Sequence, residues 1–117
     1  MIIGIGVDIV RISRFKKLSE KAVKRLFTAE EIRLFKVRKP ERMAVNFAAK
    51  EALIKALGRS ISWKEVEVLR DKGGKPYIKS SGKLKELLGL KGIRNIHLSM
   101  SHEGDYAIAF LILEGGN

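Results

Sequence analysis

Residues 40–58, PERMAVNFAAKEALIKALG, predict a long helix around which the rest of the chain can be arranged. Pro40 suits the first turn of a helix, and Gly58 suits the position just after its end. On a helical wheel, Glu51 falls within an apolar stripe whose other members, each within about 60° of it, are Ala44, Phe47, Ala48 and Ile54. The stripe predicts the face on which the helix packs against a sheet.

The segments before this helix predict one strand and two further helices. Ile2–Val10 is apolar and β-branched apart from two glycines and Asp8, which predicts a buried strand. Apolar residues at spacings of three and four predict a helix over Ile12–Leu26. Thr28 and Glu31 have the spacing of a capping box, which indicates a short helix over Ala29–Phe35.

The segments after the long helix predict mainly strands. Alternating apolar residues on both sides of residues 71–74 indicate a β-hairpin, and a short helix is expected over Gly82–Leu88. Asn95–Ser101 and Tyr106–Leu113 predict two strands joined by a turn at residues 102–105. The order βαααββαββ indicates an α+β fold, with an antiparallel sheet packed against one long helix. We expect residues 1–117 to form a single domain.

The chain is strongly basic, which favours an anionic binding partner. The 117 residues include 24 lysines and arginines against 13 aspartates and glutamates, a formal net charge of +11. The absence of cysteine excludes a disulfide scaffold, a thiol nucleophile and a cysteine-based zinc site. No apolar run approaches the ~20 residues of a membrane span. Since residues 1–10 also lack the features of a signal peptide, we expect a cytoplasmic protein without membrane contact.

Two carboxylates stand where the pattern predicts apolar residues. Burying a carboxylate is costly unless it is paired, protonated or bound to a cation. Glu51 could pair with Lys55 four residues later, and Asp8 could end its strand and cap the next helix. Alternatively, both carboxylates belong to one Mg²⁺ site, completed by water and phosphate oxygens.

The segment SMSHEGDYA, residues 99–107, places His102 at the end of a predicted strand. This histidine is either an ordinary polar surface residue or a phosphate contact whose ring is oriented by Asp105 or Glu103. A Ser-His-Asp triad is disfavoured because its members would lie too close together along one turn. The glycine-rich stretches 4–8 and 71–78 lack the spacing of a dinucleotide fold or a phosphate loop.

Five segments together resemble the holo-acyl carrier protein synthases, the short single-module class of 4'-phosphopantetheinyl transferases. They are GIGVDIV (4–10), FTAEEI (27–32), NFAAKEALIKALG (46–58), GKPYI (74–78) and SMSHEGDYAIAF (99–110). The resemblance covers nearly the whole chain in the right order. It implies a Mg²⁺-dependent transfer of 4'-phosphopantetheine from coenzyme A to a serine of apo-acyl carrier protein, with release of adenosine 3',5'-bisphosphate.

The resemblance also implies roles for individual residues. Asp8 and Glu51 match the metal ligands of the family, and Lys55 would neutralise charge that develops on the pyrophosphate. The general base is Glu51 or a water on the metal. Coenzyme A would be contacted by four further residues, through a side chain at His102 and through backbone groups at Gly74, Lys75 and Pro76.

One position departs from the family pattern. Asn46 stands where many members carry arginine, so a phosphate contact is either missing or supplied by Lys50 or Arg42.

The basic charge is concentrated in residues 11–42, where twelve basic and four acidic side chains give a local net charge of +8. Acyl carrier proteins are strongly acidic, so we expect this stretch to dock the carrier. The predicted contacts, on the expected first helix, are Arg14, Lys17, Lys21, Lys24 and Arg25. The family implies a homotrimer with sites between subunits and a role in fatty acid biosynthesis. A nucleic-acid-binding module without catalysis is the alternative, but it leaves Asp8 and Glu51 unexplained.

Overall fold

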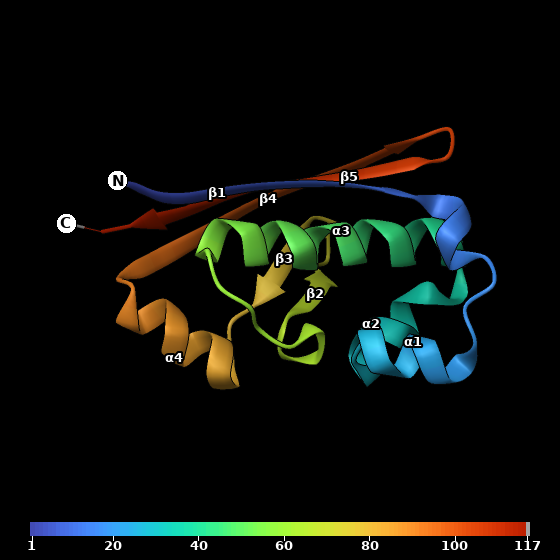
Figure 1. Cartoon of the computed structure of the whole chain (residues 1–117), viewed down its shortest axis with the longest axis horizontal. Coiled ribbons are helices and arrows are strands. Elements are labelled where there is room, and N and C mark those ends of the chain that lie inside the picture. Colours follow the sequence, from blue (N-terminus) through green and yellow to red (C-terminus); the bar gives the residue numbers. More distant parts are fainter. Residues whose placement is uncertain (117) are drawn as a thin grey trace.

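The structure is a computed structural model in which residues 1–116 are described. A three-stranded antiparallel sheet in the order β1-β5-β4 covers one side of helix α3 (Figure 1). The strands are β1 (Ile2–Arg11), β4 (Ile93–Glu103) and β5 (Tyr106–Gly115), and α3 spans Lys39–Leu57. The predicted long helix and its place against a sheet are therefore confirmed, including Gly58 in the left-handed conformation at its end, with a φ of 72°.

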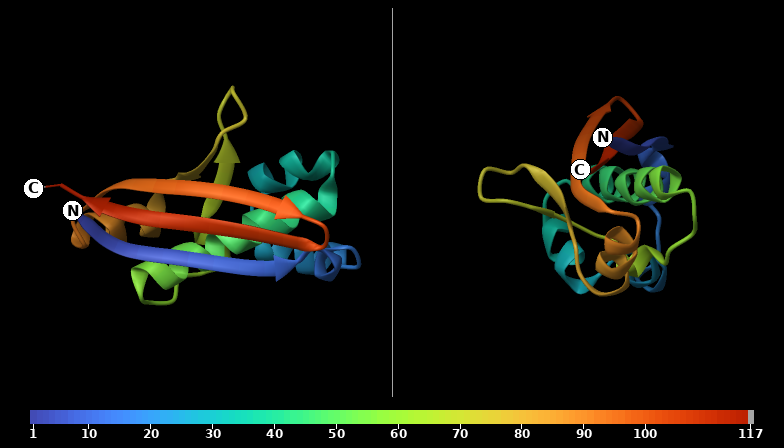
Figure 2. Two further views of the ribbon diagram at one scale, coloured as in Figure 1. Left: turned by 90° about the horizontal axis from the view of Figure 1, so that it is seen from above. Right: turned by 90° about the vertical axis from the view of Figure 1, so that its left-hand side faces the viewer.

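The remaining elements lie mostly on the other side of α3. Helices α1 (Glu20–Leu26) and α2 (Ala29–Arg33) lie below one end of it, and α4 (Gly82–Leu90) lies below the other (Figure 1). The hairpin of β2 (Glu67–Arg70) and β3 (Pro76–Lys79) forms a second sheet whose turn projects from the body of the molecule (Figure 2). Three short 3₁₀ segments complete the fold, namely η1 (Ile12–Phe15), η2 (Leu34–Lys36) and η3 (Trp63–Glu65).

Two glycines allow β1 to lie directly on α3. A Cβ atom added to Gly6 would lie 2.7 Å from the carbonyl carbon of Ala52, and one added to Gly4 would lie 3.0 Å from that of Ala56. Both obstacles are backbone atoms of α3, which cannot swing aside as a side chain could. Asp8 lies on the same face of β1 as Gly4 and Gly6, the face toward α3, because alternate residues of a strand share a face.

The prediction that Ile2–Val10 is a buried strand is wrong for one of its faces. Gly6 and Val10 are buried against α3, whereas Ile5 and Ile9 are 55% and 60% exposed. The strand is apolar on both faces, and hydrophobic runs of this kind ordinarily indicate burial on both sides. In this chain only the face toward α3 is covered by the described residues.

The predicted helix over Ile12–Leu26 is also wrong, because the chain forms η1, a connection at residues 16–19, and then α1. Ser19 caps α1 by accepting a hydrogen bond from the backbone N–H of Ala22. A capping residue at this position starts a new helix rather than continuing an old one. The capping box of Thr28 and Glu31 is present as predicted, although α2 ends at Arg33 and the chain continues as η2.

The element order βαααββαββ and the hairpin are confirmed, but the strands form two sheets rather than one. Strand β4 includes His102 and Glu103, so the turn to β5 contains only Gly104 and Asp105. Among the described residues, no helix is both long and apolar enough to cross a membrane.

Candidate active site

Asp8 and Lys55 form a contact between β1 and α3. The Lys55 ammonium lies 3.1 Å from Asp8 Oδ1 and also donates to the carbonyl of Val7 at 3.0 Å. The Asp8 side chain is only 15% exposed, and that of Lys55 is 57% exposed. The alternative in which Asp8 caps the next helix is wrong, because β1 continues to Arg11.

Glu51 lies one turn before Lys55 on α3 and is half-buried. Its Oε2 atom accepts a hydrogen bond from the indole N–H of Trp63 in η3, at 3.1 Å. The simple Glu51–Lys55 pair is not formed, since the ammonium reaches Asp8 instead. The Asp8–Lys55 contact joins the edge strand β1 to α3, and Glu51 lies one helical turn from Lys55; we refer to these three residues as the acidic group.

The acidic group has the chemistry that a magnesium ion requires. It offers two carboxylates from different elements, and Mg²⁺ prefers few protein oxygens together with water and phosphate oxygens. Within residues 1–116, no cluster of three or more histidine, cysteine, aspartate or glutamate side chains could hold a metal by itself. A metal would therefore need oxygens from a bound ligand in addition to Asp8 and Glu51.

A second feature is a cavity of about 460 Å³ that is rich in basic side chains. It lies between the start of α3, the hairpin and the end of β4, and we call it the basic cavity. Its polar lining residues are Arg38, Glu41, Arg42, Arg70, Lys75, Ser99, Ser101 and His102. Four arginines and lysines against one glutamate give this cavity a positive charge, which favours binding of a highly charged anion.

Two arginines of the basic cavity lie close enough for their charges to interact. The Nε atom of Arg42 is buried and has no hydrogen-bond partner among the described residues. Burial and, to a smaller extent, the charge of Arg42 lower the pKa of Arg70 below its usual value. An anion in the cavity would offset the repulsion between the two guanidinium groups.

The four residues predicted to contact coenzyme A have different surroundings. Lys75, Pro76 and His102 line the basic cavity. Gly74 does not, and its backbone N–H and carbonyl are bonded to Asp71 and Arg70 within the hairpin. Within residues 1–116 the His102 ring is hydrogen-bonded to neither Asp105 nor Glu103, the two carboxylates expected to orient it, and Asp105 instead accepts hydrogen bonds from Ser13.

A fully buried polar network lies on the side of α3 opposite the sheet. The carboxylate of Glu31 accepts hydrogen bonds from Lys50 Nζ at 2.6 Å and from Asn46 Nδ2 at 3.1 Å. Lys50 also donates to the carbonyls of Leu26 and Trp63, at 2.9 and 2.7 Å. The prediction that Lys50 supplies a phosphate contact is therefore wrong, whereas Arg42 lines the basic cavity.

Sequence reasoning missed this network because it treated Glu31 only as half of a capping box. Glu31 does bond to the backbone N–H of Thr28, but its second oxygen also accepts from the N–H of Val68. A signal was available in Asn46 and Lys50, two polar residues four positions apart in the largely apolar run from Met43 to Leu53. Such a spacing places both on one helix face.

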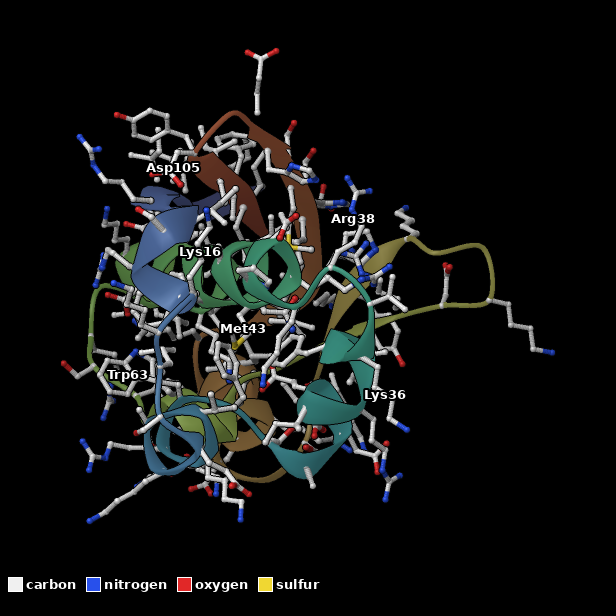
Figure 3. All side chains as sticks on the ribbon, turned by 90° about the vertical axis from the view of Figure 1, so that its right-hand side faces the viewer. Lys16, Lys36, Arg38, Met43, Trp63 and Asp105 are labelled. Atoms are coloured by element: carbon white, nitrogen blue, oxygen red, sulfur yellow. The ribbon has the colours of Figure 1, made fainter. Side chains whose placement is uncertain are left out.

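The acidic group and the basic cavity are separated within one chain. Asp8 lies on β1 and His102 on β4, which are the two edge strands of the sheet. In Figure 3, Arg38 of the basic cavity lies to one side of α3, and Trp63, which contacts Glu51, lies to the other. A single chain therefore does not bring the two predicted halves of the site together.

The five basic residues predicted to dock a partner are all exposed. Contrary to expectation they do not share one helix, because Arg14 lies in η1 and Lys17 in the connection that follows it. Lys21, Lys24 and Arg25 lie on α1, where Lys24 pairs with Glu20 at 3.5 Å. A pair as exposed as this one contributes little stability and leaves the surface charge available.

Comparisons with a family model and with individual proteins point to the same family of transferases. Residues 4–111 match the family model of the 4'-phosphopantetheinyl transferase superfamily. The chain is 46% identical to the holo-[acyl-carrier-protein] synthase of Clavibacter michiganensis, with 98% of both chains covered. It is 47% identical to that of Alkaliphilus metalliredigens, with 93% of this chain and 96% of the relative covered.

The fold is also similar to solved structures of holo-[acyl-carrier-protein] synthases. The synthase of Neisseria meningitidis matches with a TM-score of 0.90 and 36% identity, over 97% of this chain and 99% of that one. The Helicobacter pylori synthase, solved in complex with coenzyme A, matches with a TM-score of 0.83 and 32% identity, over 94% and 99% of the two chains.

Proposed function

The chain belongs to the 4'-phosphopantetheinyl transferase superfamily, and from this premise we propose its function and the residues that perform it. The protein is an enzyme that transfers 4'-phosphopantetheine from coenzyme A to a serine of apo-acyl carrier protein and releases adenosine 3',5'-bisphosphate. The observation that carries this function is the identity of 41–47% to proteins with that activity in their name, which extends over nearly the whole chain.

In the reaction, the serine oxygen attacks the phosphorus atom on the pantetheine side of the pyrophosphate. The bond from this phosphorus to the bridging oxygen breaks, and adenosine 3',5'-bisphosphate leaves with that oxygen. Glu51, either directly or through a water that it holds, is the proposed general base for the serine proton. The Lys55 ammonium is exposed on its outer side, and its positive charge stabilises the pyrophosphate as negative charge moves to the leaving group.

Asp8 and Glu51 are the proposed Mg²⁺ ligands. When bound, the ion would neutralise phosphate charge and hold the pyrophosphate in line for attack. The acidic group fits this role, because Lys55 and Trp63 each engage one carboxylate oxygen and leave the other available. Lys55 also offsets the charge of Asp8, which limits the cost of burying that carboxylate.

The basic cavity is the proposed site for the nucleotide of coenzyme A. Its arginines and lysine are suited to a 3'-phosphate and a pyrophosphate, and Arg42 is one of the side chains that line it. This assigns to Arg42 the phosphate contact that Asn46 does not provide. Gly74 contributes by holding Arg70, whose guanidinium donates to its carbonyl at 3.1 Å.

We propose a homotrimer in which the outer face of the sheet is the contact between copies. In the β1–β5 register, Val7 lies beside Phe110 and Ile9 beside Ile108, so their exposed side chains form a continuous apolar patch. Such a patch on a small basic protein is an interaction surface. Association through it would bring β1 of one copy near another copy, so that acidic group and basic cavity combine across the contact.

The acidic carrier protein is proposed to dock on Arg14, Lys17, Lys21, Lys24 and Arg25. These exposed charges would mainly accelerate encounter and orient the carrier, because charges at the rim of an interface contribute more to rate than to affinity. We also propose that residues 1–117 form one domain, since α3 packs against β1, β5 and β2 alike. A cytoplasmic location and a role in fatty acid biosynthesis complete the proposal.

The test is a transfer assay with coenzyme A, Mg²⁺ and apo-acyl carrier protein, in which mass spectrometry measures the mass that 4'-phosphopantetheine adds to the carrier. We expect transfer by the wild type, and near-complete loss in Asp8→Asn and in Glu51→Gln. Glu30→Gln, on the surface of α2, is the matched control and should retain activity, because this carboxylate pairs with the exposed Arg33 away from the proposed site. Absence of transfer with several carriers would contradict the function, and activity in either carboxylate variant would remove that residue from it.

A further inference from the structure

Trp63 is the only tryptophan of the chain and contacts the acidic group directly. Its indole N–H donates to Glu51 Oε2 at 3.1 Å. A hydrogen bond to a charged acceptor is stronger than one between neutral groups. The indole therefore restricts how the Glu51 carboxylate can turn.

Trp63 is itself held by the buried network. Its carbonyl accepts a hydrogen bond from Lys50 Nζ at 2.7 Å, and this ammonium is fixed in turn by Glu31. The indole ring packs on Phe47, with the ring centroids 5.9 Å apart. The backbone and the ring are thus both positioned from α3, the helix that carries Glu51.

The ring is not enclosed on its remaining side. Trp63 lines a cavity of about 570 Å³ between η3 and α4, together with Ile61, Leu87 and Leu90. In Figure 3 it lies at the side of the molecule, between α3 and α1. Because packing covers only part of the ring, the hydrogen bond to Glu51 is needed to fix the relation between indole and carboxylate.

We propose that Trp63 is a positioning residue, which holds Glu51 so that its free oxygen is directed at the metal and the substrate phosphates. The inference rests on the function proposed above and adds the group that orients one of its metal ligands. Partners that orient a metal ligand in this way typically change metal affinity or activity by about 10- to 100-fold when they are removed.

Trp63→Phe tests the proposal, because it preserves an aromatic ring on Phe47 and removes only the N–H donor. We expect the Mg²⁺ concentration for half-maximal transfer to rise about 10-fold or more, while kcat at saturating Mg²⁺ falls less. Ser62→Ala, which changes an exposed neighbour whose side chain makes no capping bond, is the matched control and should show no change. Trp63→His restores a ring N–H and should recover part of the affinity.

Fluorescence gives a readout that needs no carrier protein and no transfer reaction. Since the single indole bonds to Glu51, titration of the wild type with Mn²⁺ in the presence of coenzyme A should quench its emission, and Asp8→Asn should abolish this response. The positioning role would be overturned if folded Trp63→Phe needed the same Mg²⁺ concentration for half-maximal transfer as the wild type. It would also be overturned if Mn²⁺ left the tryptophan emission of an active wild type unchanged. An inactive wild type that still shows the quench would instead overturn the function and support the placement of Glu51.

Discussion

Gly6→Ala tests the close packing on which the acidic group depends. The added Cβ would lie 2.7 Å from the carbonyl carbon of Ala52 and 3.1 Å from the backbone nitrogen of Ala56. The nearest obstacle is the carbonyl oxygen of Ala52, which lies closer than this carbon. Because ordinary contact begins at 3.4 Å, β1 must move away from α3 by more than the roughly 0.7 Å that the carbon alone would require. Overpacking costs about 1–3 kcal/mol, and a value near 3 is expected because backbone atoms cannot be rearranged locally.

This cost is measurable as a lower melting temperature. For a chain of this size, a loss of 3 kcal/mol corresponds to a decrease in Tm of roughly 10–15 °C. The displacement also carries Asp8, two residues along the strand, away from Lys55, to which it lies at 3.1 Å. We therefore expect transfer at a temperature well below Tm to decrease together with stability, and to require more Mg²⁺.

Gly89→Ala is the matched control for Gly6→Ala. Gly89 lies in α4, and a Cβ added there meets no atom within 4 Å. Alanine is preferred to glycine in a helix, so this variant should be as stable as the wild type or more stable by about 0.5 kcal/mol. Thermal unfolding followed by circular dichroism measures the Tm of both variants and of the wild type. A Gly6→Ala protein that melts within about 2 °C of the wild type would refute the packing argument.

Three further predictions concern the buried network, the basic cavity and the apolar patch. Lys50→Met should lower the free energy of unfolding by about 3–5 kcal/mol in urea denaturation, because Glu31 loses its buried partner; a loss below about 1 kcal/mol would contradict this. Arg42→Ala should weaken coenzyme A binding about 10-fold or more by calorimetry, whereas the exposed Arg33→Ala should not, and equal affinities would exclude Arg42 from the site. Phe110→Lys should reduce the mass in solution to the 13.1 kDa of one chain, which light scattering would show, and a wild type already at that mass would contradict the trimer.

Local patterns were sufficient to predict most of the elements. Helix α3 was predictable because an apolar stripe, a proline in its first turn and a terminal glycine agree, and the capping box of Thr28 and Glu31 forms as its spacing indicates. The hairpin followed from alternation around a glycine-rich turn. In each case the signal lies within a few residues of the element that it specifies.

Contacts between distant segments were not predictable in this way. The position of Lys50 depends on Glu31, on the end of α1 and on Trp63, which are 13 to 24 residues away along the chain. The break between η1 and α1 depends on Ser19, whose capping role was overlooked because the apolar spacing runs through it. The two carboxylates were recognised as misplaced, but the partners of Asp8 and Glu51 appear only in the folded chain.

The misinterpretation of β1 as a fully buried strand is informative about the proposed assembly. A strand that is apolar on both faces predicts burial on both sides, yet residues 1–116 cover only the face of Gly6 and Val10. If the apolar pattern of β1 reflects burial of both faces in the assembled protein, the outer face of β1 must be covered by another molecule. The same condition follows from the site, because Asp8 and His102 lie on opposite edge strands of one sheet. Both requirements are met by one proposal, that further copies of this chain pack on the outer face of β1 and β5.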